Sequence, residues 1–529
     1  MTELLTAGQM RAVEQTAIKS GAVTGLELME RAGQGVVDAI FEEWPELDRR
    51  GASPSRSPEY FEKDEEVSRR VVVLCGPGNN GGDGFVVARL LHGLGWQVEA
   101  FLYGDVEKLP PDARVNYERW IELGRVRPFG EAPTGDCGAA LYVDALFGTG
   151  LQRPLTGEVL AWAVARASEP QLVNKTVSVD IPSGLCADSG RDLAGEAETV
   201  RAGLTVSFHT AKPGHYLGHG PARSGCLVVR DIGLTEPVEG AVRLVSGEGI
   251  EFGKAQGAHK YSHGHALVLA GGPGKTGAAR LAARGALRIG AGLVTLGVPP
   301  AAQMEVACQI TALMLQRVDG PEGLSDLLQD DRLNALCLGP GLGLACAAEL
   351  VPVALAAKRP TVLDADALTA LAETSGCLMA ELHEECVLTP HGGEFSRLFP
   401  DIAEKLAAVP GRGPGYSKVD AVRAAAARAG CVVLLKGSDT VIAAPDGRCA
   451  INAASYERAA PWLATAGSGD VLAGFITGLL ARGFAPMQAA EAGAWLHVEC
   501  ARQFGPGLIA EDLPEQVPIL FNKSDIRLL

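Results

Sequence analysis

The feature that most constrains the fold is a short apolar run followed by a glycine loop and a helical pattern, which recurs along the chain. Residues 71–75 run into the glycine loop 76–84, and residues 141–145 run into a second glycine loop. Short Val and Leu runs that alternate with Ala-rich helical patterns are typical of α/β folds with glycines at the strand-to-helix turns. We therefore predict an α/β architecture.

The length of the chain predicts more than one domain. A chain of 529 residues is too long for a single hydrophobic core. A turn-rich stretch at 231–249 is the best candidate for a linker, and we expect domains at 1–238 and 245–529. Residues 48–70 are polar and contain two prolines, which predicts an exposed insertion.

Charge and composition exclude several classes of protein. The formal net charge of −16 and the absence of a basic stripe argue against a nucleic-acid surface. No apolar run reaches the length of a membrane span and the N-terminus shows no secretory signal, so we expect a cytoplasmic protein without a membrane partner. The 12 cysteines are scattered singly, which predicts buried thiols in a reducing compartment, without disulfides or structural zinc.

The sequence Gly467-Ser468-Gly469-Asp470 precedes an apolar run at 471–480. The glycines allow a tight loop with bare backbone N–H groups, and the run is long enough for a buried helix whose positive end faces that loop. This combination predicts an anion site in which Asp470 can take a proton from a substrate hydroxyl. The simpler alternative is an aspartate that only stabilises the start of a helix.

The first half carries a fingerprint for phosphate-containing cofactors. Residues 76–81 match G-x-G-x-x-G between a predicted strand and a helix predicted at 85–94. The acidic residue expected about 20 positions later is poorly placed. Asn79, Asn80 and Asp83 are better suited to hold a ribose, an amide or a cation.

Three successive strands of the first half end in polar side chains. Parallel strands would bring Asn80, Asp144, Asp180 and Ser183 to one sheet edge, where open α/β folds bind ligands. Such oxygen donors suit an alkali or alkaline-earth cation. Each residue could instead serve only to form a turn.

In the second half, successive apolar strands again end in polar loops. Lys436 and residues 437–440 suit phosphates or adenosine, and His391 suits a polar substrate group. A nucleoside-triphosphatase P-loop is rejected at 271–278, because Leu269 stands where its first glycine is required.

The remaining basic residues give weaker signals. Three histidines lie close together in the sequence, and they are better explained as part of a loop than as a metal site. They are His259, His263 and His265. Lys212 and His215 are candidates only for the rim of a site.

These motifs resemble two known families. Residues 78–84, 143–150 and 179–184 are similar to the NAD(P)H-hydrate epimerase family, which has a Rossmann-like fold. Residues 339–343, 388–391, 436–440 and 467–470 are similar to the NAD(P)H-hydrate dehydratase family, which has a ribokinase-like fold. Nearly the whole chain therefore resembles the bacterial bifunctional NAD(P)H-hydrate repair enzymes.

The resemblance implies that the first half interconverts the R and S forms of NADH hydrate and NADPH hydrate, as an isomerase. Asp180 would be its acid/base residue. The implied potassium ligands are Asn80, Asp144 and Ser183. The implied hydrate-binding residues are Asn79, Asn80, Gly81, Gly82, Asp83, Gly148, Thr149, Gly150, Leu151, Gln152, Arg153, Pro154 and Asp180.

The resemblance implies that the second half is a lyase that dehydrates the S form with ADP and magnesium, with Asp470 as its catalytic residue. The implied hydrate-binding residues are Ala278, Gly341, His391 and Asp470. The implied nucleotide-binding residues are Lys436, Gly437, Ser438, Asp439, Thr440 and Gly469. We also expect a homo-oligomer, whose subunit number no motif specifies.

Two other functions remain open at this point. A ribokinase-like vitamin or sugar kinase would use Asp470 to phosphorylate a small-molecule hydroxyl, with a first half that only senses a nucleotide. A binding or regulatory protein would use the first half as an interaction module.

Overall fold

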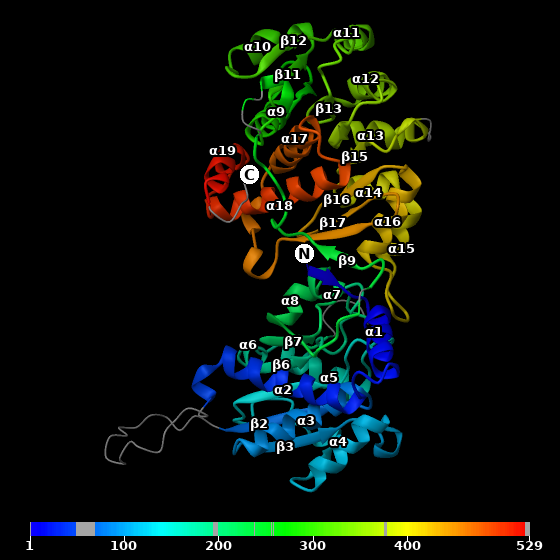
Figure 1. Cartoon of the computed structure of the whole chain (residues 1–529), viewed down its shortest axis with the longest axis vertical. Coiled ribbons are helices and arrows are strands. Elements are labelled where there is room, and N and C mark those ends of the chain that lie inside the picture. Colours follow the sequence, from blue (N-terminus) through cyan, green and yellow to red (C-terminus); the bar gives the residue numbers. More distant parts are fainter. Residues whose placement is uncertain are drawn as a thin grey trace, which may run out of the picture. The chain divides into compact units, whose positions relative to one another are not determined.

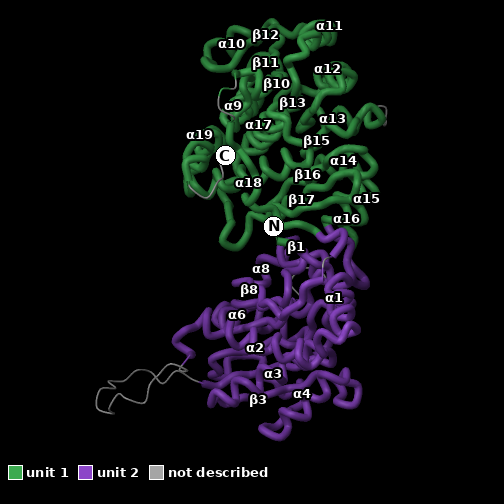
Figure 2. Tube along the Cα trace, in the orientation of Figure 1, with its two compact units in different colours: residues 1–2, 242–408, 418–529 green, residues 3–241, 409–417 purple. Residues whose placement is uncertain are grey.

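A computed structural model of the chain shows two compact units (Figures 1 and 2). Unit 2 contains residues 3–241 and 409–417, and unit 1 contains residues 1–2, 242–408 and 418–529. The residues that the structure describes are 2–48, 69–193, 199–236, 238–254, 257, 259–374 and 378–523. The insertion predicted at 48–70 lies outside these residues except at its two ends.

Unit 2 contains a seven-stranded parallel sheet in the order β4-β3-β2-β5-β6-β7-β8. The chain builds outward from β2 to β3 and β4, and then returns to β5 and builds in the opposite direction. The order of strands therefore reverses between β2 and β5. The strands are β2 (Arg70–Cys75), β3 (Gln97–Leu102), β4 (Val126–Pro128), β5 (Leu141–Ala145), β6 (Thr176–Val179), β7 (Leu204–Phe208) and β8 (Cys226–Arg230).

Apolar residues alternate along β2 because both faces of this sheet are covered. Val71 and Val73 belong to the core that includes helices α2 and α3, whereas Val72 and Leu74 belong to the core that includes Trp162. The helices are α1 (Ala7–Lys19), α2 (Gly25–Glu43), α3 (Asn79–Gly93), α4 (Pro111–Ile121), α5 (Gly157–Ala167), α6 (Pro170–Asn174), α7 (Pro213–Tyr216) and α8 (Gly220–Ser224), with 3-10 turns η1 (Pro45–Leu47), η3 (Val106–Lys108) and η4 (Phe129–Glu131).

Helix α3 begins earlier than the sequence pattern predicts. It starts at Asn79 instead of Phe85, so the polar residues of the glycine loop form its first turn. Glycine at 82 is required there, because a Cβ would lie 2.6 Å from Met29 Sδ and 2.9 Å from Ala113 Cα. The glycines that suggested an open loop instead let a helix end pack closely against its neighbours.

Unit 1 contains an eleven-stranded sheet in the order β1-β9-β18-β17-β16-β15-β14-β13-β10-β11-β12. The strands from β12 to β16 are parallel, and β17 is antiparallel to both of its neighbours. The order of strands reverses between β10 and β13. The strands are β1 (Thr2–Leu4), β9 (Val242–Leu244), β10 (His265–Leu269), β11 (Leu293–Val298), β12 (Met314–Arg317), β13 (Ala335–Leu338), β14 (Thr361–Leu363), β15 (Cys386–Leu388), β16 (Val432–Leu435), β17 (Asp439–Ala443) and β18 (Cys449–Ala453).

The helices of unit 1 follow these strands and cover the sheet (Figure 1). They are α9 (Gly277–Arg288), α10 (Gln303–Ala307), α11 (Gly320–Leu327), α12 (Leu344–Ala356), α13 (Ala365–Glu373), α14 (Gly392–Leu398), α15 (Pro400–Ala407), α16 (Lys418–Ala429), α17 (Ser468–Ala481), α18 (Pro486–Phe504) and α19 (Asp512–Phe521), with 3-10 turns η5 (Lys260–His263), η6 (Pro300–Ala302), η7 (Leu378–Glu381), η8 (Tyr456–Arg458) and η9 (Pro461–Leu463). The predicted α/β class is confirmed.

Helix α17 is the central helix of unit 1, and every residue from 471 to 481 is buried. Two glycines let it press against the backbone of α9. A Cβ at Gly474 would lie 2.1 Å from Ala282 O, and a Cβ at Gly478 would lie 2.6 Å from Ala286 O. The predicted buried helix after Asp470 is confirmed, and Asp470 lies in its first turn.

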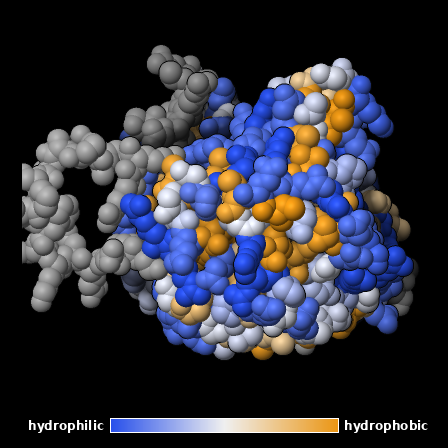
Figure 3. Space-filling model, turned by 90° about the horizontal axis from the view of Figure 1, so that it is seen from below, coloured by the Kyte–Doolittle hydropathy of each residue, from blue (hydrophilic) through white to orange (hydrophobic). Residues whose placement is uncertain are grey.

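The surface gives two further observations. No helix among the described residues is both long and apolar enough to cross a membrane. The face seen in Figure 3 is largely hydrophilic, with hydrophobic areas near its centre.

Gly474→Ala should destabilise unit 1 by about 1–3 kcal/mol, because the added methyl group meets backbone atoms of α9 that cannot move aside alone. The measurement is urea unfolding followed by circular dichroism. Gly323→Ala in α11 is the control, because its Cβ would meet no atom closer than 3.5 Å. Equal stability of the two variants would contradict the tight contact between α9 and α17.

Candidate active sites

The first site lies where the strand order of unit 2 reverses, between β2 and β5. The Gly76 N–H donates to Ala145 O at 3.0 Å, so the loops after these two strands run side by side. A Cβ at Gly148 would lie 2.9 Å from Asn80 Oδ1 and 3.3 Å from Asp180 Oδ2. Open parallel sheets bind ligands at such a reversal, and the structure brings Asn80, Gly148 and Asp180 together there.

Asp180 follows β6 in a left-handed backbone conformation with a φ of 67°. Its Oδ1 accepts from Lys212 Nζ at 2.8 Å, and its Oδ2 accepts from the Thr149 N–H at 3.4 Å. Burial opposes ionisation of the carboxyl, but Lys212, His215 and the Thr149 N–H together outweigh burial, and the pKa of Asp180 is lowered. Asp180 is therefore ionised at neutral pH.

Lys212 and His215 are not rim residues as predicted, because both are buried, with 1% and 0% of their surface exposed. The Lys212 N–H donates to His215 Nδ1 at 2.9 Å, so the ring proton sits on Nε2, 3.0 Å from Asp180 O. Burial, with the nearby Lys212 charge, lowers the pKa of His215 to about 4. A neutral imidazole thus fixes the backbone that carries Asp180.

Two further carboxyl groups share this site. Burial, followed by the charges of Asp180 and Glu14, raises the pKa of Asp83 well above its ordinary value. The pKa of Glu14 in α1 is also raised, chiefly by burial and then by Asp180. The protonated form of Asp83 is thus favoured while the ionised form of Asp180 is favoured, and opposite shifts of this kind separate an acid from a base. Glu14 was not predicted, because it lies on a helix without a motif.

The predicted cation ligands also lie together. Asp144 is fully buried and accepts from Ser183 Oγ at 2.7 Å, from the Ser183 N–H at 3.0 Å and from Ser178 Oγ at 3.0 Å. Burial raises the pKa of Asp144 although these bonds oppose the shift. Asn80 Nδ2 is buried, and no described residue provides it with a hydrogen-bond partner. A buried carboxylate among hydroxyl, carbonyl and amide oxygens suits a hard cation.

The other residues predicted to bind the hydrate come from the loops after β2 and β5, and most of them do not contact the carboxyl groups of this site. Gly81 and Gly82 are buried in the first turn of α3, beside Asn79. Thr149 touches Asp180 through its backbone, and Gly150 and Leu151 follow it. Gln152 and Arg153 are exposed, and Pro154 is half-buried. In the described part of the chain, no side-chain hydrogen bond joins Gln152 or Arg153 to the carboxyl cluster.

The second site lies where the strand order of unit 1 reverses, between β10 and β13. A Cβ at Gly271 would lie 2.0 Å from Gly341 O, so the loops after these strands meet. Gly341 has a φ of +63°, and a Cβ there would lie 2.6 Å from Lys275 O and 3.3 Å from Ala278 Cβ. The structure therefore places Ala278 and Gly341, which were predicted to share a binding site, side by side.

Asp470 approaches this place from the start of α17. Burial, followed by repulsion from Asp364, raises the pKa of Asp470 to about 6, and Lys436 partly opposes the shift. Lys436, after β16, binds Asp364 Oδ1 at 2.7 Å and lies 3.9 Å from Glu394 Oε2. Asp364 was predicted only as a strand end, yet it is the group that connects Lys436 with Asp470.

His391 follows β15 and caps α14. Its Nδ1 accepts from the backbone N–H groups of Gly393 at 3.0 Å and Glu394 at 3.3 Å. Its Nε2 lies 3.4 Å from Glu394 Oε1, and its side chain is 55% exposed. His391 is therefore held in place through Nδ1, while about half of its side chain stays exposed beside Glu394.

A cavity of about 530 Å³ lies beside the start of α17. The predicted nucleotide residues that line it are Lys436, Gly437, Ser438, Thr440 and Gly469. Asp439 does not line it, because its carboxylate binds Lys418 Nζ at 2.6 Å. His497 of α18 also lines the cavity and contacts Ser468 O at 2.9 Å through Nε2. It was missed because it lies in a long helical pattern without a motif.

Comparison with known proteins covers both units. Residues 25–214 match the family model described as the YjeF-related protein N-terminus, and residues 266–515 match the model described as NAD(P)H-hydrate dehydratase. The bifunctional NAD(P)H-hydrate repair enzyme Nnr of Moorella thermoacetica is 35% identical over 99% of this chain and 97% of its own length. The chain belongs to the family of bifunctional NAD(P)H-hydrate repair enzymes.

Single-function relatives of this repair-enzyme family match each half separately. The NAD(P)H-hydrate epimerase of Rhodobacter capsulatus is 48% identical over 41% of this chain and 92% of its own length. The solved ADP/ATP-dependent NAD(P)H-hydrate dehydratase of Bacillus subtilis, co-crystallised with ATP and Mg²⁺, is 28% identical over 53% of this chain and 98% of its own, with a TM-score of 0.45.

Lys212→Met should destabilise unit 2 by about 3–5 kcal/mol, because it leaves the buried Asp180 carboxylate without its cation. The pKa of Asp180 should also rise, since burial is then less opposed, and any reaction that needs ionised Asp180 should lose activity at a higher pH than in the wild type. The measurements are urea unfolding and a pH–rate profile.

Lys108→Met is the matched control, because Lys108 is 81% exposed and lies 3.8 Å from Asp105. We expect little effect from it. An unchanged stability and an unchanged pH profile for Lys212→Met would contradict the role of the ion pair.

Proposed function

We propose that this chain repairs NADH and NADPH damaged by hydration, with an epimerase site in unit 2 and an ADP-dependent dehydratase site in unit 1. The observation that carries this proposal is that both predicted site motifs lie where the order of parallel strands reverses. The relatives of the first half include a protein named NAD(P)H-hydrate epimerase, and the family model that matches the second half is described as NAD(P)H-hydrate dehydratase. One chain would then recover both epimers, although only the S form is dehydrated directly.

The epimerase chemistry needs an acid and a base at one place. Protonated Asp83 can donate its proton to the hydroxyl of the hydrate as the ring C–O bond breaks, which releases water and leaves a cation that the ring nitrogen stabilises. Water can then add to the opposite face and give up a proton to ionised Asp180. The proton returns from Asp180 to Asp83 before the next turnover.

We propose that Asn80, Asp144 and Ser183 hold a potassium ion. The buried Asp144 carboxylate and Asn80 Oδ1, which lies beside Gly148, are oxygen donors that support this assignment. The cation would offset the charge of Asp144 and hold the segments that carry Asn80 and Ser183 in place.

The dehydratase chemistry uses ADP to improve a leaving group. Ionised Asp470 can accept the proton of the S hydroxyl as the oxygen attacks the β-phosphorus of ADP and the bond to AMP breaks. The ring C–O bond then breaks with loss of phosphate, and the neighbouring ring carbon loses a proton to restore the double bond. The products are NAD(P)H, AMP and phosphate.

The nucleotide and its metal ion would occupy the cavity beside α17. We propose that Lys436, Gly437, Ser438 and Thr440 hold the phosphates, with Gly469 next to Lys436, whereas Asp439 is bound by Lys418. Asp364 and Glu394 lie within 3.9 Å of Lys436 Nζ and are oxygen donors of the kind that Mg²⁺ takes. The ion would neutralise charge on the transferring phosphoryl group.

The remaining predictions are not tested by the structure. We propose a cytoplasmic homo-oligomer, and the hydrophobic areas seen in Figure 3 are candidate places for subunit contacts. A ribokinase-like vitamin kinase is not favoured, because relatives that match the whole length are repair enzymes.

Two carboxamide variants test the two sites separately. Asp470→Asn should reduce ADP-dependent recovery of NADH from the S hydrate by at least about 100-fold, because the base is lost. Asp180→Asn should keep that recovery near the wild-type rate and abolish enzyme-dependent conversion of R to S. The measurements are NADH absorbance and chromatographic separation of the two epimers.

The outcome that would contradict the assignment is the reverse pattern, or near wild-type activity for both variants. Each variant serves as the folding control for the other, since each should retain the activity of the unit that it leaves unchanged.

A further inference from the structure

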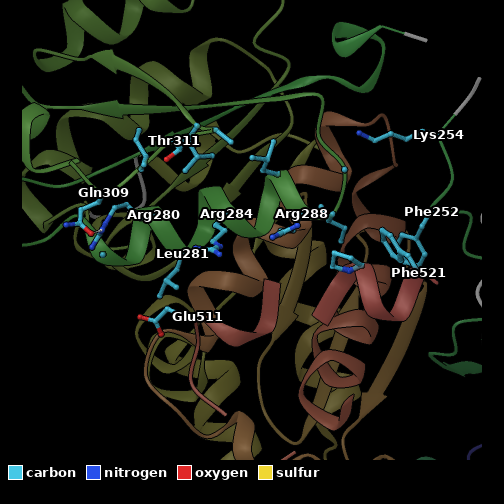
Figure 4. A pocket seen from close by; sticks show the side chains of 18 of the residues that line it. Phe252, Lys254, Arg280, Leu281, Arg284, Arg288, Gln309, Thr311, Glu511 and Phe521 are labelled. Atoms are coloured by element: carbon cyan, nitrogen blue, oxygen red, sulfur yellow. Dashed lines mark hydrogen bonds between the residues drawn. The ribbon is translucent and has the colours of Figure 1, made fainter. Parts of the chain in front are cut away.

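A second, larger cavity of about 1160 Å³ lies along α9 in unit 1 (Figure 4). It shares no lining residue with the cavity assigned to ADP. Arg280, Arg284 and Arg288 follow one another along this helix at intervals of four residues and all line the cavity. Residues spaced by four lie on one face of a helix, so the cavity has a row of guanidinium groups along one wall.

Arg280 differs from the two arginines that follow it. Arg284 and Arg288 both bind Glu515, at 2.8 Å and 2.5 Å, so that carboxylate offsets their charge. Arg280 Nη1 instead donates to a neutral acceptor, Gln309 Oε1, at 3.2 Å. Its Nε is buried without a hydrogen-bond partner in the described part of the chain. A guanidinium with a buried N–H donor that lacks an acceptor can bind an anion.

The cavity adjoins the dehydratase site. Gly277 lines it, and the next residue, Ala278, is the one that faces Gly341. Leu281 also lines it, and Leu281 Cδ1 lies 2.8 Å from the position of a Cβ on Gly467, three residues before Asp470. The Arg280 guanidinium points back toward this end, since its Nη2 lies 4.0 Å from the position of a Cβ on Gly277.

The substrate has a second half that needs a place to bind. NAD(P)H hydrate is a dinucleotide, so a diphosphate and an adenosine follow the hydrated nicotinamide riboside. If the hydrated ring lies between Ala278 and Asp470, the AMP half must extend outward from the start of α9. The eight residue steps from Arg280 to Arg288 span about 12 Å of helix, and the cavity exceeds the volume of most ligand pockets.

We propose that the cavity along α9 binds the AMP half of NAD(P)H hydrate and that Arg280, held by Gln309, binds its phosphate. This inference rests on the dehydratase function proposed for unit 1. ADP would then occupy the cavity on the other side of the start of α17, and the two nucleotides would not compete. Arg284 and Arg288, which are both bound to Glu515, would line the part of the cavity that receives the adenosine.

Arg280→Gln in the full chain tests this assignment, because glutamine keeps a polar side chain but removes the charge. We expect the KM for the S form of NADPH hydrate to rise at least tenfold, with kcat and the KM for ADP within twofold of the wild type. A loss confined to KM is the signature of binding that is equal in the ground state and the transition state. The matched control is Arg317→Gln, since Arg317 lies outside the cavity, is 57% exposed and pairs with Asp319.

Hydrated nicotinamide mononucleotide, which lacks the AMP half, separates the proposal from a general structural effect. Arg280→Gln should leave the KM for this truncated substrate within twofold of the wild type. The proposal is overturned if the variant keeps its KM for the dinucleotide hydrate, or if both substrates lose affinity equally. If the wild type recovers no NADPH from the S hydrate, the dehydratase function itself fails.

Discussion

Parallel strands in an open sheet bring all their carboxyl ends to one edge, and both candidate sites depend on this geometric constraint. In unit 2 the carboxyl ends of β2, β5 and β6 bring Asn80, Asp144 and Asp180 to one place. In unit 1 the loops after β13 and β16 deliver Gly341 and Lys436. Residues far apart in the sequence therefore meet because of the sheet topology alone, and no special contact between their strands is needed.

The two sites use the same electrostatic arrangement. Each has a carboxylate bound to a lysine, Asp180 to Lys212 and Asp364 to Lys436, with Nζ–Oδ1 distances of 2.8 Å and 2.7 Å. Each also has a second carboxyl whose pKa is raised, chiefly by burial. That group is Asp83 in unit 2, and it is Asp470 in unit 1. In each site a lysine thus binds one carboxylate while burial makes a second carboxyl more basic, which provides groups for proton transfer.

The sequence was sufficient to predict the α/β class and most of the clustered residues, because both follow from local patterns. Asp470 was placed correctly in the first turn of a buried helix, since two glycines and a long apolar run specify that structure locally. The nucleotide cavity was largely anticipated as well, with Asp439 as the exception, because its partner Lys418 lies 21 residues earlier.

Long-range packing explains what the sequence did not reveal. Lys212 looked like a rim residue because a lone lysine is usually exposed, and only the fold shows that Asp180 pairs with it in the interior. Glu14 and His497 lie on helices without motifs, so no local signal connects them to a site. The early start of α3 was missed because glycine normally disfavours a helix, whereas here it permits the close contact with Met29.

The central claim is that both units act on one damaged cofactor. The most direct measurement supplies the purified protein with the pure R epimer of NADH hydrate, ADP, magnesium and potassium, and follows the return of NADH absorbance. The account predicts complete recovery at a rate well above that of spontaneous epimerisation, which requires both sites. Recovery from the S epimer alone, with the R epimer reacting no faster than it does without protein, would contradict it.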